Sequence, residues 1–356
     1  MVQLTRYELR KIIGKKMVWF MLIFMAFFNL LAYFKMGAAR EKVITTEGEI
    51  LEGTEAIRYM QEFDRRYQGE LTDEKAEELH DKAYSKEAAE KAGKYFYNLC
   101  PDIIQYVDNR FYREKGMTTA DVFTPEMGKI QLGYHKGYTL LLFQGINMML
   151  VAGCVIVTAI APVFSEEYAK GTDALILTAR YGKTLLVRAK IAAAFIFGAL
   201  ICMSVVGVNG ILFLSAYGTE GWDTSVQVDI TGRNWTVPYE MNYGEMLGYA
   251  VLIWLAACLL LTGMTLLISA CCRTSFAAVV LAAACFVVPV WFSIPQWVQA
   301  MMPAYQMQVT TVLGLTSVSA FGQKIMPLWI AIGISATAMI AFGIAAKKKF
   351  AGWQVG

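Results

Sequence analysis

The sequence predicts an all-α, polytopic membrane protein with six transmembrane helices. Hydrophobic residues make up 56% of the 356 residues and charged residues 17%, whereas an ordinary soluble domain carries about 25% charged residues. Six stretches lack an ionisable residue and are long enough to span, since a transmembrane helix needs about 20 apolar residues, with a range of about 17–25. Lysine and arginine cluster in the four segments that six crossings place on one side of the membrane.

In chain order, the predicted spans are residues 18–34, 138–164, 191–217, 246–272, 275–293 and 325–346. The first and the fifth lie near the short end of the range for a spanning helix. An alternative for the first stretch is a cleaved signal peptide, with Gly37-Ala38-Ala39 as the small-residue site. Its apolar core is longer than the roughly 7–15 residues of a signal peptide, which favours an uncleaved span.

The basic residues near the span ends predict the orientation. They are Arg6, Arg10, Lys11, Lys15 and Lys16 before the first span, Lys170, Arg180, Lys183, Arg188 and Lys190 after the second, Arg273 after the fourth, and Lys347, Lys348 and Lys349 after the last. Cytoplasmic flanks carry an excess of lysine and arginine. Both termini are therefore expected in the cytoplasm, with residues 347–356 as a cytoplasmic tail, because an odd number of spans would put one cluster on the wrong face.

Residues 1–17 are predicted to form an amphipathic helix that lies in the membrane interface. At 100° per residue, Val2, Leu9, Ile12 and Ile13 share one face. The expected interface residues are Arg6, Arg10, Lys11, Lys15 and Lys16, because basic side chains are attracted to anionic lipid headgroups. The alternative is a plain basic flank that only fixes orientation.

Residues 35–137 are predicted to form a small, mainly helical external domain between spans 1 and 2. Ile57, Met60, Phe63 and Tyr67 recur at helical spacing. Acidic and basic residues are mixed along this segment, so no nucleic-acid partner is expected. Of the seven cysteines, Cys100 alone falls in an external segment.

Two further segments are predicted to be external. In residues 218–245, the alternation of Val226, Val228 and Ile230 with polar residues predicts a β-hairpin. Residues 294–324 are too apolar for a free loop and are broken by Pro295 and Pro303. Backbone at membrane depth is tolerated where protein surrounds it, so one or two re-entrant or interfacial helices are expected there. A loop lying on the headgroups is the alternative.

The chemistry missing from the sequence limits its function. The six predicted spans contain no Asp, Glu, Lys, Arg or His, and such residues cost about 2.5–3.5 kcal/mol at the centre of a span, so they are kept mainly for function. The chain thus lacks the usual parts of a self-powered proton pump. No GxxxxGK[ST] motif occurs, so no ATP hydrolysis, catalytic residue, metal or cofactor is expected in this chain. Gln144, Asn147 and Asn209 could line a pathway or hydrogen-bond between helices.

Residues 165–190 form the one long cytoplasmic loop. After Phe164 it reads SEEYAKGTDALILTARYGKTLLVRAK, which is similar to the "E…G…LL.T…S/G+..LL..K" stretch of the ABC type-2 transporter permeases, a bacterial branch of exporters. The basic amphipathic start, the external insertion and the broken apolar segment before the last span have the same order as in that family. The chain resembles its membrane-spanning subunit, although the external domain is larger than in the simplest members.

The resemblance implies a subunit in the bacterial plasma membrane that contacts lipids, forms a homodimer or a heterodimer with a related permease, and exports a substrate. ATP and Mg²⁺ would be used by a partner ABC ATPase subunit. The residues predicted to couple to that ATPase are Glu166, Glu167, Gly171, Asp173, Leu175 and Arg180.

Glu166 and Glu167 stand out because a cytoplasmic flank favours bases, not acids. Their alternative role is an exposed pair with Lys170, worth only about 0–1 kcal/mol, and the basic residues of the loop could hold lipid phosphates instead. Two other classes of protein stay open. One is a non-transporting membrane sensor or immunity protein with a ligand-binding external domain. The other is a membrane enzyme, which would need a polar catalytic cluster at a membrane face.

Overall fold

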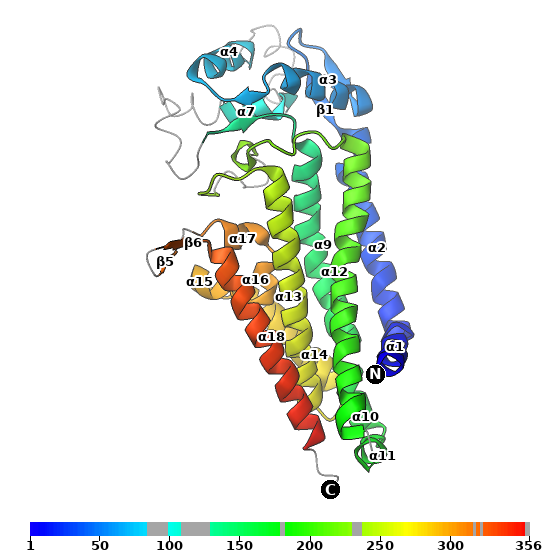
Figure 1. Ribbon diagram of the computed structural model, residues 1–356. Helices are drawn as coiled ribbons and strands as arrows, with labels where there is room; N and C mark the ends of the chain where they lie inside the picture. The colour runs from blue at the N-terminus through cyan, green and yellow to red at the C-terminus, as the bar shows by residue number, and fades with distance from the viewer. Residues whose placement is uncertain are drawn as a thin grey trace.

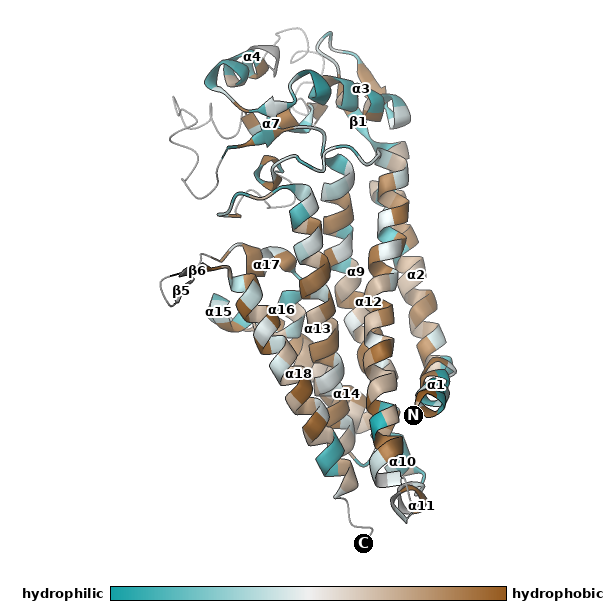
Figure 2. Cartoon of the chain, viewed as in Figure 1, coloured by the Kyte–Doolittle hydropathy of each residue, from teal (hydrophilic) through white to brown (hydrophobic). Residues whose placement is uncertain are grey.

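The computed structural model describes residues 1–83, 99–107, 129–178, 182–229, 237–315, 318–320 and 323–352. Most of these residues are helical. Figure 1 shows an elongated bundle of helices with a cap of short elements at one end. Helix α1 (Val2–Ile13) and the end of α18 (Pro327–Ala351) lie at the opposite end. Hydrophobic residues dominate the bundle in Figure 2, whereas hydrophilic residues gather in the cap and on α1.

Five helices in the described ranges are long and apolar enough to cross a membrane. They are α2 (Lys16–Met36), α9 (Lys136–Ile160), α12 (Val187–Tyr217), α13 (Tyr243–Cys271) and α18. They coincide with five of the six predicted spans. Helix α9 continues past a break at Ala161 into α10 (Pro162–Ala169), and a π-helical turn, η4 (Gly182–Leu186), precedes α12.

The predicted fifth span, residues 275–293, is a shorter helix. Helix α14 (Ser275–Val287) gives way to a 3₁₀ turn, η7 (Val288–Trp291), which contains Pro289. Thirteen residues of α-helix rise about 20 Å, less than the roughly 30 Å of a hydrocarbon core. Three short helices follow, α15 (Gln296–Gln299), α16 (Pro303–Gln306) and α17 (Val309–Leu313). To cross the membrane a sixth time, the chain would have to combine α14 with η7 and the short helices that follow. The count of six spans therefore stays a prediction.

The cap contains most of the described part of residues 35–137. A 3₁₀ turn η1 (Ala38–Arg40) leads to the antiparallel pair β1 (Lys42–Ile44) and β2 (Ile50–Glu52), followed by α3 (Gly53–Arg66), β3 (Gly69–Glu70), α4 (Asp73–Ala83), α7 (Asp102–Val107) and β4 (Gln131–Leu132), which pairs with β3. The predicted apolar face of α3 is confirmed, because Ile57, Met60 and Phe63 are buried, as is Tyr67 just beyond the helix. A separate core of buried residues holds the cap together.

The predicted β-hairpin is wrong for residues 226–228, which form the 3₁₀ turn η5 (Val226–Val228). All three residues are buried, and the polar side chain of Gln227 can be buried because its Nε2 donates hydrogen bonds to the carbonyl oxygens of Val237 and Tyr239. The alternation of apolar and polar residues therefore does not separate a buried face from an exposed one. The rest of the predicted turn, residues 230–236, lies outside the described residues. A second short pair joins β5 (Val318–Ala320) and β6 (Gln323–Ile325).

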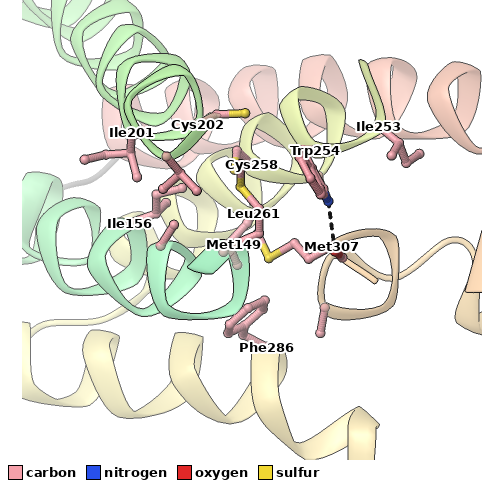
Figure 3. Packing of buried hydrophobic residues seen from close by; sticks show 14 of the residues in the cluster. Met149, Ile156, Ile201, Cys202, Ile253, Trp254, Cys258, Leu261, Phe286 and Met307 are labelled. Atoms are coloured by element: carbon pink, nitrogen blue, oxygen red, sulfur yellow. Dashed lines mark hydrogen bonds between the residues drawn. The ribbon is translucent and has the colours of Figure 1, made fainter. Parts of the chain in front are cut away.

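The core of the bundle is shown in Figure 3, where side chains from α9, α12, α13 and α14 meet. Trp254 Nε1 on α13 donates a hydrogen bond to the carbonyl oxygen of Met307, at 2.9 Å, and so ties the segment of short helices to the bundle. Two glycines of α9 permit this packing. A Cβ atom at Gly145 would lie 2.5 Å from the Trp254 ring, and one at Gly153 would lie 2.3 Å from the Phe286 ring.

Candidate functional site

Charged side chains from three elements meet where α1 lies against the end of the bundle. Lys190 Nζ on α12 lies 2.9 Å from Glu8 Oε2 on α1 and 2.8 Å from Glu167 Oε1 on α10. Lys11 Nζ on α1 lies 2.6 Å from the same Glu167 oxygen. Lys190 is 1% exposed, and Glu8 and Glu167 are each 5% exposed. We refer to Glu8, Lys11, Glu167 and Lys190 as the buried ion cluster.

A second set of ion pairs lies beside the cluster and is more accessible. Glu166 Oε2 lies 2.7 Å from Lys15 Nζ, and Glu166 Oε1 lies 2.6 Å from Lys170 Nζ. The Lys170 side chain is 62% exposed. The pair with Lys170, the alternative role for the two acids, is therefore present at Glu166, whereas Glu167 pairs with Lys11 and Lys190. Both glutamates also bind lysines at the start of the chain, so their charges hold the α1 segment against α10.

The packing of α1 combines apolar and ionic contacts. Ile12 is buried in the main core, and Leu9 and Ile13 pack against it, whereas Val2 is 83% exposed. Arg6, Arg10 and Lys16 are exposed, and Lys11 and Lys15 are engaged in the ion pairs above. The face of α1 that meets the bundle is therefore partly charged.

The electrostatic environment differs between the two engaged lysines. Burial disfavours the charged form of Lys11, but the hydrogen bond with Glu167 and the charges of Glu167 and Glu8 outweigh it and raise the pKa of Lys11. At Lys15, burial is the larger effect and lowers the pKa, although the hydrogen bond with Glu166 opposes it.

The loop beyond the cluster presents a small exposed helix. Helix α10 ends before Gly171, whose φ of +67° is the left-handed conformation that glycine adopts without strain at the end of a helix. Helix α11 (Asp173–Thr178) follows, with Asp173 as its first residue and Leu175 74% exposed. Arg180 lies outside the described residues. Figure 1 shows α11 at the tip of the bundle, next to α10.

A hydroxyl group connects the base of this loop to the next helix. Ser269 Oγ on α13 donates to the Ala161 carbonyl oxygen at 2.6 Å and accepts from the backbone N–H of Phe164 at 2.9 Å. These backbone groups lie at the break between α9 and α10, where Pro162 supplies no N–H. Ser269 therefore satisfies the backbone of the break and links α10 to α13.

The three predicted pathway residues have different surroundings. Gln144 Nε2 on α9 donates to Asn29 Oδ1 on α2 at 3.0 Å, and both side chains are buried. Asn147 and Asn209 instead donate to carbonyl oxygens one turn earlier in their own helices. Gln144 thus joins two helices. Asn29 was missed, although it is the one polar amide in the first predicted span.

Sequence reasoning found one half of the charged site. The sequence points to Glu166 and Glu167, which are acids in a basic flank, but it gives no such signal for Glu8, and it indicates for Lys190 only a part in the basic cluster that predicts the orientation. The pairing of Lys190 with Glu8 joins residues 182 positions apart, which one sequence does not reveal. Within the part of the chain that the structure describes, no group of three or more His, Cys, Asp or Glu residues could hold a metal ion.

A bundle of long apolar helices with a charged, loop-bearing end defines a multi-pass membrane protein. Residues 2–316 match the family model described as "ABC-2 family transporter protein". The match runs from α1 to the end of α17 and beyond, most of the chain, so the chain belongs to this family of transporter permeases. No curated protein matches the chain.

Proposed function

We propose that this chain is the permease subunit of a bacterial ABC exporter, that it works as a homodimer or a heterodimer with a related permease, and that separate ATPase subunits drive it. The observation that carries the proposal is the exposed helix α11 at the tip of a loop whose base is tied to α1, α12 and α13. The family match supports the transport class. The sequence contains no P-loop motif, which supports the proposal that ATP and Mg²⁺ are used by the partner subunit.

The proposed coupling acts through α11 and α10. A partner that pushes on the exposed Leu175 would move α11 and the end of α10. Glu167 passes that movement to α1 and α12 through Lys11 and Lys190, and Ser269 passes it to α13. In this proposal Glu166 and Glu167 act inside the chain, as the link between the loop and the helices, while α11 makes the contact with the ATPase.

Replacing Leu175 with glutamate is expected to weaken binding of the ATPase subunit at least about tenfold, because an unpaired charge would be buried in an apolar contact. The measurement is co-purification of the chain with a partner ABC ATPase subunit, sought first among the P-loop ATPases encoded by neighbouring genes, together with substrate-stimulated ATP hydrolysis by the complex. The matched control is Ile50→Glu, which changes an apolar residue that is 49% exposed on the cap. Unchanged binding and stimulation in Leu175→Glu would refute the proposed contact between α11 and the ATPase. ATP hydrolysis by the purified chain alone would refute the proposal that a separate subunit hydrolyses ATP.

The proposal also fixes the orientation: α1, α11 and the end of α18 in the cytoplasm, and the cap outside. Single cysteines are introduced at Glu55 on the cap or at Leu175, both exposed, in a chain without its native cysteines. An impermeant thiol reagent applied to intact cells is expected to label position 55 and not position 175, and to label both after permeabilisation. The reverse pattern in intact cells would refute this topology.

A further inference from the structure

Asp64 is a buried carboxyl group without a full set of partners. It lies near the end of α3 in the cap and is 2% exposed. Its Oδ1 atom has no hydrogen-bond partner among the described residues. A buried carboxylate is strongly disfavoured unless it is paired and hydrogen-bonded. Burial, with the nearby negative charge of Asp102, raises the pKa of Asp64 well above its usual value.

Asp64 lies on the face of α3 that carries the buried residues Ile57 and Met60. Ile57 and Met60 belong to the same core cluster as Leu141 on α9 and Tyr217 on α12, so this face of the cap meets the bundle. Asp102, the first residue of α7, lies 3.3 Å from Lys136 Nζ, and Lys136 is the first residue of α9. This ion pair fastens the cap to the outer end of α9. The charges of Asp102 and Lys136 affect the ionisation of Asp64 directly. The other charged or titratable groups near this joint are Glu41 before β1, Tyr134 and His135 before α9, Glu220 after α12, which pairs with Arg65, and Asp229 after η5.

We propose that Asp64 makes this joint responsive to protons: the joint is closed while Asp64 is neutral and loosens when Asp64 loses its proton. A second carboxylate beside Asp102 would have to share the one cation, Lys136, that fastens α7 to α9. Asp102 keeps its own charge throughout, because the charge of Lys136 outweighs the burial of Asp102 and lowers its pKa. Of the two carboxyl groups, Asp64 is therefore the one that titrates.

The direction of the effect follows from the raised pKa of Asp64. In the open joint the carboxyl group is solvated and has an ordinary pKa of about 3.9. The stability that neutral Asp64 gives to the closed joint is fully present at pH values below this ordinary pKa. It is lost as the pH rises from the ordinary pKa through the raised pKa of the closed form. Acid closes the joint, and alkali opens it.

Movement at this joint would reach the rest of the molecule along one element. Lys136 begins α9, which runs to Ile160 and continues into α10, where Glu167 belongs to the buried ion cluster. The proton-responsive joint does not depend on the transport function proposed above, because it concerns the contact between the cap and α9 alone.

The test uses Cys100, which is 6% exposed in the cap and lies two residues before Asp102. In a full-length chain whose other six cysteines are replaced, the rate of labelling by an impermeant thiol reagent is measured from pH 5 to pH 9. The same rates are measured with Asp64→Asn. Dividing the rate of the chain that keeps Asp64 by the rate of Asp64→Asn at each pH cancels the pH dependence of the thiol itself. Since the ratio follows the ionisation of Asp64, it is expected to rise about tenfold for each pH unit below the raised pKa.

The matched control is Glu62→Gln, which removes an exposed carboxylate from the same helix. It is expected to label as the unchanged chain does at every pH. A ratio that stays constant from pH 5 to pH 9 overturns the proposal. Faster labelling of Asp64→Asn than of the unchanged chain at every pH also overturns it, because the carboxylate would then be what holds the joint closed. A second neutral variant, Asp64→Ser, must reproduce the slow labelling of Asp64→Asn at pH 9.

Discussion

Replacing Lys190 with methionine is expected to lower the free energy of unfolding by about 3–5 kcal/mol. The methionine fills most of the volume of the lysine stem but leaves the carboxylates of Glu8 and Glu167 buried, with Lys11 as the one remaining cation of the buried ion cluster. The loss of charge compensation, and not a loss of packing, is therefore the main cause. The measurement is thermal or denaturant unfolding of the purified chain in detergent, followed by the fluorescence of its tryptophans.

The control for this variant is Lys170→Met, which removes a lysine of the same loop whose side chain is 62% exposed in its pair with Glu166. An exposed pair is worth about 0–1 kcal/mol, so the control is expected to be nearly neutral. The triple variant Lys190→Met, Glu8→Gln, Glu167→Gln removes both buried carboxylates and is expected to recover most of the loss. Equal losses for Lys190→Met and Lys170→Met would show that burial does not govern the cluster.

The long helices were predictable because their signal is local. A run of apolar residues long enough to span is visible in a short window of the sequence, and α2, α9, α12, α13 and α18 coincide with five such runs. The predicted fifth span shows the limit of that signal. Residues 275–293 are apolar throughout, but the α-helix ends at Val287, ahead of Pro289, and a 3₁₀ turn follows. Hydropathy measures the length of an apolar run and not the length of the helix within it.

The charged site was predictable only in part, because its partners are distant in sequence. Two acids next to each other in a basic flank are unusual, which made Glu166 and Glu167 candidates. Their partners lie on α1 and α12, and nothing in the sequence around Glu8 or Lys190 indicates that they meet. The same limit applies to the joint at Asp64, where the burial of a carboxyl group depends on the packing of α3 in the cap.

Replacing Gly153 with valine is expected to lower the free energy of unfolding by about 3 kcal/mol, at the upper end of the usual cost of overpacking. The new Cβ atom would lie 2.3 Å from Phe286 Cζ and 2.6 Å from Phe286 Cε1. Because Phe286 is only 3% exposed and lies in the packed core, its ring can move only by displacing its neighbours, and α14 is expected to shift away from α9. The measurement is unfolding in detergent, combined with the accessibility of a cysteine placed at Ala282 on the buried face of α14.

The control is Gly248→Val on α13, where a Cβ atom would meet nothing within 4 Å. It is expected to change the stability by less than about 1 kcal/mol, since only the backbone preference of the residue changes. Phe286→Leu, combined with Gly153→Val, is expected to recover part of the loss, because the two sites share one contact and their effects are not additive. A stable Gly153→Val variant with an unchanged, inaccessible Ala282 position would show that α14 does not pack on α9.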